Sequence, residues 1–75
     1  MPIERPEEEL RDIRRSVMSQ ARDKGNSSGN VTWIYTQFDG RYPDKHWSDL
    51  PAEEREKWSR ETFELGLQEG ELHVD

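Results

Sequence analysis

The sequence contains no cysteine, so the chain can form neither a disulfide bond nor a thiolate zinc site, and it has no cysteine nucleophile. It also has no apolar run near the roughly 20 residues that span a bilayer, and its first residues are not typical of a secretion signal. These absences predict a cytoplasmic protein that does not contact a membrane. The two matches to the glycosylation sequon, at Asn26 and Asn30, are therefore interpreted as turn and capping residues.

Apolar residues are scarce, since they make up 29% of the 75 residues while 37% are charged. A chain of this length forms one domain, here residues 1–75, and buries only about 60% of the surface that its unfolded state exposes. The core must therefore be thin and depend on the aromatic side chains, each of which can bury about 150–250 Å2. A partner protein or a second copy in a homodimer could complete such a fold.

The net charge of −6 is unevenly distributed. Residues 1–25 hold six basic and six acidic side chains, whereas residues 51–75 hold three basic and eight acidic ones. A negative field repels phosphate backbones and attracts basic surfaces. We therefore expect the partner to be another protein with a basic surface, and nucleic acid to be the less favoured ligand.

The first predicted helix covers residues 6–24. Pro6 suits a helix start, and the three glutamates that follow it complement the positive end of the helix dipole. Leu10, Ile13, Val17 and Ala21 recur at helical spacing and predict a buried face. Residues 25–30 are rich in glycine, serine and asparagine and predict a flexible polar loop.

Residues 31–38 carry two patterns at once. Their β-branched and aromatic content favours a strand, and Asp39-Gly40 is a hairpin turn signal. However, Val31, Ile34 and Phe38 have the spacing of a helix face, and Asn30 can cap its start. A returning strand would also be cut short by a proline after two residues. We predict a short helix over residues 31–38, with a short β-hairpin as the alternative.

A third helix is predicted over residues 51–66, because a first-turn proline and two glutamates mark its start and Asp49 can cap it. Its apolar residues fall on two faces, Trp58 and Leu65 on one and Phe63 and Leu67 on the other. Such a helix contacts either a returning part of its own chain or a partner. The tail, residues 67–75, has no clear pattern. The predicted fold class is all-α, a small three-helix module.

The most specific pattern is Trp47-x-x-Leu50-Pro51-x-x-x-Arg55-x-x-Trp58. Trp47 and Leu50 precede the third helix and can fold back against Trp58, as a hydrophobic staple fixes the entry of a chain into a helix. The pattern therefore predicts a structural clamp.

Residues 33–58 resemble small helical proteins encoded by phages and prophages, in which an aromatic-containing helix and a glycine turn precede Trp-x-x-Leu-Pro and a helix with Arg and Trp. This resemblance implies an accessory protein or an inhibitor of a host factor, and it supplies no catalytic residue. Residues 47–58 alone also resemble the junction between the second and third helices of HMG boxes. HMG boxes are strongly basic where this chain is acidic.

Candidate binding residues lie mainly on the third helix, where acidic side chains could mimic a DNA backbone and occupy a basic groove. The predicted protein-binding surface is Tyr42, Glu56, Glu61, Phe63, Glu64 and Leu67. The alternatives are a nucleic-acid-binding strip formed by Arg11, Arg15 and Arg22, or a self-associating structural component. We expect no enzyme, metal or cofactor, because no nucleophile–base pair or phosphate loop is recognisable and His46 is interpreted as an exposed loop residue.

Overall fold

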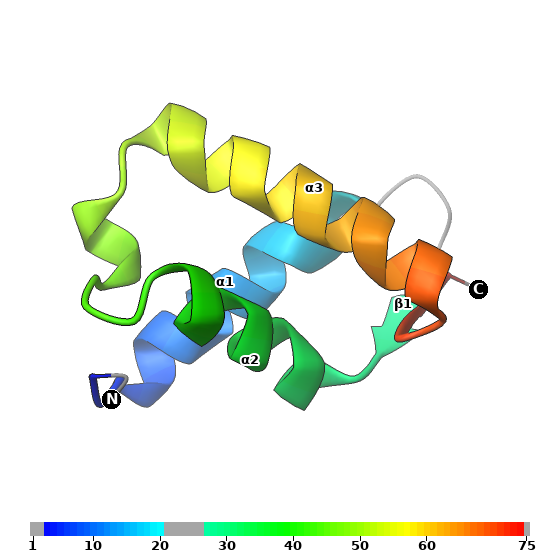
Figure 1. Cartoon of the computed structure of the whole chain (residues 1–75), viewed down its shortest axis with the longest axis horizontal. Helices are drawn as coiled ribbons and strands as arrows, with labels where there is room; N and C mark the ends of the chain where they lie inside the picture. Colours follow the sequence, from blue (N-terminus) through cyan, green and yellow to red (C-terminus); the bar gives the residue numbers. More distant parts are fainter. Residues whose placement is uncertain (1–2, 21–26, 75) are drawn as a thin grey trace.

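The computed structural model describes residues 3–20 and 27–74, which form three α-helices, a 3-10 helix and two short strands. The bounds are Glu7–Met18 for α1, Ser27–Gly29 for β1, Val31–Arg41 for α2, Trp47–Asp49 for the 3-10 helix η2, Ala52–Glu69 for α3 and Leu72–Val74 for β2. Figure 1 shows α1 behind α2 and α3, with η2 at one end of the molecule and the strands at the other. The predicted all-α three-helix module is confirmed.

Helix α1 begins after an extended Pro6, whose carbonyl accepts the backbone N–H groups of Glu9 and Leu10. Its α-helical part ends at Met18, and residues 19 and 20 continue it with 3-10 geometry, while residues 21–24 of the predicted helix lie outside the described part. The hydroxyl of Ser19 donates to the carbonyl of Ser16 at 2.7 Å. That carbonyl would otherwise accept the next helical N–H, and serine side chains compete with helical bonds in this way.

Residues 31–41 are helical, so the alternative of a β-hairpin is wrong. The side chain of Asn30 caps α2 by accepting the backbone N–H of Trp33 at 3.2 Å, and Ile34 and Phe38 form its buried face. The helix runs through the Asp39-Gly40 turn signal and stops at Tyr42, since the residue before a proline avoids helical backbone angles.

The position of Asp49 had suggested that it caps α3, but the structure shows that it does not. Its carboxylate accepts the backbone N–H of His46 at 2.9 Å and so caps η2. Helix α3 follows directly after Pro51 and extends three residues beyond the predicted end. It stops at Gly70, which has φ 75° and ψ 12°, a left-handed conformation that glycine adopts without strain.

The tail folds back on α3, and the predicted loop before α2 is partly a strand. Strand β2 pairs antiparallel with β1, with Ser28 opposite His73 and Gly29 opposite Leu72. The backbone N–H of Asn30 also donates to the carbonyl of Glu71 at 3.0 Å. This pairing joins segments far apart in the sequence, so the local polar composition of residues 25–30 does not predict it.

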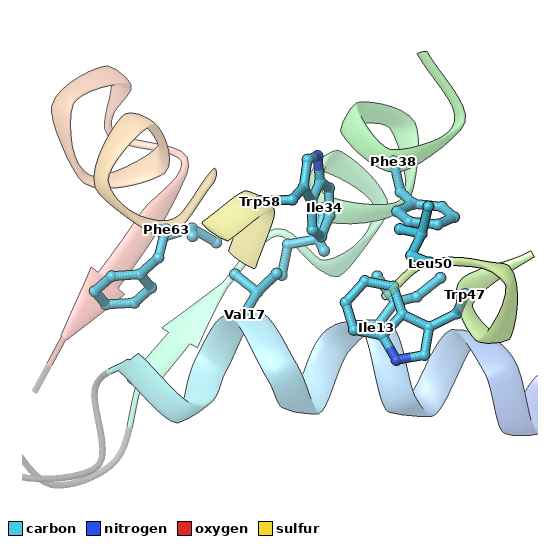
Figure 2. Close-up of a cluster of buried hydrophobic side chains, with 9 residues drawn as sticks. Ile13, Val17, Ile34, Phe38, Trp47, Leu50, Trp58 and Phe63 are labelled. Atoms are coloured by element: carbon cyan, nitrogen blue, oxygen red, sulfur yellow. The ribbon is translucent and has the colours of Figure 1, made fainter. Parts of the chain in front are cut away.

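The core is one cluster in which all three helices, η2 and β2 take part. Figure 2 shows Ile13 and Val17 rising from α1, with Phe63 at one end of the cluster and Phe38 and Trp47 at the other. Its buried members are Ile13, Val17, Ile34, Phe38, Trp47, Leu50, Trp58, Phe63 and Leu72. Four of these are aromatic, which is how a chain with few apolar residues closes a core.

The predicted tryptophan clamp is confirmed. The rings of Trp47 and Trp58 meet edge to face with centroids 6.0 Å apart, and Leu50 is buried in the same cluster. Phe38 packs edge to face on both indoles, at 5.5 Å and 5.1 Å. The clamp therefore fixes the start of α3 against α2 as well as against its own second turn.

A larger residue at position 66 should destabilise the fold, because the folded-back tail packs directly against Gly66. A Cβ added there would lie 2.5 Å from two atoms of the buried Leu72 side chain and 3.0 Å from Trp33. The clash outweighs the roughly 1 kcal/mol of helix propensity that alanine gains over glycine. We expect Gly66→Ala to lower the free energy of unfolding by about 1–3 kcal/mol in urea denaturation.

Gly40 is the matched control, since it also lies inside a helix and has nothing within 4 Å of an added Cβ. Gly40→Ala should raise the free energy of unfolding by about 0.5–1 kcal/mol. If both variants were stabilised, the tail would not pack on Gly66 as described.

Candidate functional site

A buried arginine joins the start of α1 to the end of α2 and to the segment before η2. The guanidinium of Arg5 donates to Asp39 Oδ1 at 2.7 Å and to Glu9 Oε1 at 2.6 Å. It also donates to the backbone carbonyls of Lys45 and Tyr42, at 2.6 Å and 2.8 Å. Only 3% of its side chain is exposed. Four acceptors thus satisfy a charge that would be costly to bury alone.

Glu9 is the second centre of this network, and its side chain is 8% exposed. Besides Arg5, it accepts the backbone N–H of Trp47 at 2.9 Å and bonds His46 Nδ1 through Oε2 at 2.6 Å. Burial by itself raises the pKa of Glu9, but the hydrogen bonds from His46, Trp47 and Arg5 outweigh it, so the pKa lies below its ordinary value. Glu9 is therefore an ionised carboxylate that holds η2 in place.

This network has a structural role that the sequence did not reveal. Arg5 lies with its guanidinium carbon 4.5 Å from the centroid of the Phe38 ring, so the network covers one end of the aromatic core. His46, expected as an exposed loop residue, is instead half-buried against Glu9. One sequence feature could have indicated the network. Glu9 precedes Ile13 by four residues, so it is a charged residue on the apolar face of α1.

Some residues of the predicted protein-binding surface are exposed, and others are not. Glu56, Glu61, Glu64 and Leu67 are exposed, and Tyr42 is half-buried against the core. Phe63 is only 6% exposed, so its assignment to a contact surface is wrong. On the second apolar face of α3, the chain itself therefore buries Phe63 but leaves Leu67 exposed.

A groove between α2 and α3 brings together two of the predicted residues, Tyr42 and Glu61. It consists of two adjoining hollows of about 260 and 180 Å3 that share Arg41, Trp58 and Glu61. Tyr42 lines one hollow and Leu65 the other. Leu65 was expected on the Trp58 face of α3, yet it is 41% exposed, one of the two large apolar side chains left exposed in the described part of the chain.

Glu56 lies elsewhere, in a hollow of about 550 Å3 between α1 and α3. Trp47 and Arg55 also line it, and the Arg55 guanidinium carbon is 5.8 Å from the centroid of a Trp47 ring. Arg55 Nε is buried and has no hydrogen-bond partner among the described atoms. Glu64 and Leu67 line neither this hollow nor the α2–α3 groove.

The predicted nucleic-acid strip is partly present. Arg11 and Arg15 are exposed, and Arg22 lies outside the described residues. The structure adds Arg14, which lines a surface hollow of about 490 Å3 together with Arg11, Arg15, Met18 and Ser19. Between described residues, the ion pairs all involve Arg5 or His46, so none of these three arginines is paired there.

No group of three or more histidine, aspartate or glutamate side chains in residues 3–20 and 27–74 is placed to hold a metal ion. Over the same residues, no helix has the length and apolar character needed to cross a membrane. Comparisons of the chain with protein-family models, curated proteins and solved structures give no match.

Proposed function

We propose that this chain is a non-catalytic binding module that holds a segment of another protein in the groove between α2 and α3. The observation that carries the proposal is an exposed apolar side chain, Leu65, next to an aromatic floor formed by Trp58. Contiguous exposed apolar patches rimmed by polar residues mark protein interfaces. Glu54, Lys57 and Glu61 line the groove on the side of α3, and Arg41 lines it on the side of α2.

The partner is expected to offer an apolar side chain flanked by basic residues. From residue 61 onward the sequence has five acidic residues and no lysine or arginine, so the charge that follows the groove along α3 is negative, while Arg41 and Lys57 balance Glu54 and Glu61 within the groove. The phage-type resemblance gives one concrete form of this proposal, an inhibitor that holds a basic segment of a host nucleic-acid-binding protein and so competes with its nucleic acid.

The test compares two leucines of equal exposure on opposite sides of one helix. Leu65 and Leu67 are 41% and 40% exposed, and at about 100° per residue their directions differ by about 160°. Leu65→Glu should abolish capture of the partner in affinity purification from native cells followed by mass spectrometry. Leu67→Glu should retain the same partner.

Both variants change exposed positions, so circular dichroism should confirm that each is folded. Equal loss of the partner with both variants, or retention with both, would rule out the α2–α3 groove as the binding surface.

A further inference from the structure

Arg55 is the only charged residue in the sequence pattern of the tryptophan clamp, and the clamp gives its guanidinium no acceptor. The side chain is half-buried, and its guanidinium carbon lies 5.8 Å from the centroid of a Trp47 ring. Its Nε is buried and has no hydrogen-bond partner among the described atoms. A buried donor without an acceptor is unfavourable, and such groups are rare in folded proteins. Arg55 therefore lacks a partner that a ligand could supply.

The space beside Arg55 has the size of a small-molecule site. Its volume is about 550 Å3, and ligand pockets typically have volumes of about 300–1,000 Å3. Arg15 of α1 and Arg55 of α3 both line it, so guanidinium groups from two different helices border the same space. We call this space, with Arg15 and Ser16 on the side of α1 and Trp47 and Arg55 on the other, the α1–α3 hollow.

Two serines fix the sides of the α1–α3 hollow relative to each other. The hydroxyls of Ser16 on α1 and Ser59 on α3 lie 2.7 Å apart, and the fully buried Ser59 donates to the carbonyl of Arg55 at 2.7 Å. A hydroxyl has a single hydrogen, so Ser16 is the donor to Ser59. The backbone of Arg55 is thus held against α1 before any ligand binds, which lowers the ordering cost of binding.

The charges around the hollow favour a singly charged anion. Asp12 and Glu56 line it as well and balance its two arginines. Both acidic residues are exposed to water, whereas Arg55 is half-buried, so the group that needs a partner is a donor. The two carboxylates would repel a multiply charged anion such as phosphate. A carboxylate carries one charge and matches the guanidinium fork with two parallel hydrogen bonds.

We propose that the α1–α3 hollow binds a small organic acid through one carboxylate, which accepts hydrogen bonds from Arg15 and Arg55. An apolar body attached to that carboxylate lies beside Trp47, the aromatic side chain of the lining. The hollow and the α2–α3 groove have no lining residue in common, so this site is separate from the proposed protein-binding function.

Titration of the isotope-labelled chain with benzoate, followed by the arginine Nε–H signals in NMR spectra, tests the proposal. We expect the signals of Arg15 and Arg55 to shift and to saturate with a Kd of about 1 mM. Benzamide has nearly the same shape and no charge, so it should shift neither signal. Inorganic phosphate at the same ionic strength should bind more weakly than benzoate.

Variants of the two arginines identify the site. Arg15→Gln and Arg55→Gln should each weaken benzoate binding by about tenfold or more, and so should Arg55→Lys, which keeps the charge and loses the fork. Arg14→Gln is the matched control, because it makes the same charge change at an exposed position of α1 that does not line the hollow. Circular dichroism checks folding, and the exposed Arg15 keeps the test decisive if an Arg55 variant unfolds.

The acidic residues of α3 give a test in the opposite direction. Glu56→Gln removes a carboxylate that opposes the ligand and should tighten benzoate binding about two- to fivefold. Glu53→Gln makes the same change in net charge outside the hollow and should leave the affinity unchanged.

The absence of a saturable shift with benzoate would overturn the proposal, and so would equal binding of benzamide or full affinity in the Arg15→Gln variant. Phosphate that binds more tightly than benzoate would also overturn it, and would assign the hollow to phosphate groups instead. Each of these results is independent of whether Leu65→Glu abolishes capture of a protein partner.

Discussion

Replacing Phe38 by alanine is expected to lower the free energy of unfolding by about 3–5 kcal/mol, which is most of the stability of a domain this small. Phe38 is fully buried, and ring centroids of Tyr42, Trp47 and Trp58 lie 5.1–5.5 Å from its own. The lost ring would leave a cavity at the point where α2, η2 and α3 meet, and it would expose the apolar side of the Arg5 guanidinium. The folded state would then be only marginally populated at 25 °C.

Urea denaturation followed by circular dichroism measures this loss. Phe38→Leu fills part of the cavity and should cost about 1–2 kcal/mol. Thr36→Ala, at an exposed position of the same helix, should stay within about 0.5 kcal/mol of the unaltered chain. A Phe38→Ala variant as stable as Thr36→Ala would show that the aromatic cluster is not the centre of the core.

Replacing Glu9 by alanine is expected to cost about 3 kcal/mol at neutral pH, because it breaks a buried ion pair and leaves one partner behind. The Arg5 guanidinium would lose one of its two carboxylates, and the backbone N–H of the buried Trp47 would lose its acceptor. Glu8→Ala removes an exposed glutamate from the same turn and should cost less than about 1 kcal/mol.

The difference between the Glu9→Ala variant and the unaltered chain should depend on pH. The folded-state pKa of Glu9 is below the ordinary glutamate value of 4.5, so its contribution is complete above that value and is lost as pH falls through the lower folded-state pKa. The two urea midpoints should therefore be far apart at pH 7 and converge in strong acid. Midpoints that stay equally far apart at all pH values would mean that packing, not ionisation, accounts for the loss.

The helices were predictable because their signals are local. The start of α1 follows from Pro6 and its glutamates, and α2 follows from the spacing of Ile34 and Phe38 with Asn30 as cap. The clamp of Trp47 on Trp58 was also predictable, since the two residues are close in sequence. The change of α1 to 3-10 geometry at residues 19 and 20 was missed, because hydrophobic periodicity does not distinguish the two kinds of helix.

The long-range features were not predictable from local patterns. Strands β1 and β2 hold three residues each, and their pairing joins Ser27 to Val74 across most of the chain. Arg5 and Glu9 look like ordinary charged residues of a helix start, and only the approach of α2 and η2 buries them. Phe63 is buried in the core cluster, and burial by its own chain was one of the two alternatives that its position on α3 left open.

The candidate site was predictable only in part. Local charge correctly marked α3 as the acidic element, and Tyr42 and Glu61 do share a groove. Charge does not tell which side of a helix faces a neighbouring helix, so Glu56 was grouped with residues on another face. Leu65 was correctly placed on the face of Trp58, but helical direction alone does not show that Trp58 is buried while Leu65 is 41% exposed.

The Arg5 network gives this cysteine-free chain a reversible counterpart of a disulfide. Its hydrogen bonds tie Arg5 to groups 34, 37 and 40 residues away, which is the span of a substantial cross-linked loop. A disulfide acts largely by restricting the unfolded chain, whereas this cross-link exists only in the folded state. The domain therefore has a noncovalent cross-link that thiol reductants cannot break and that forms again each time the chain refolds.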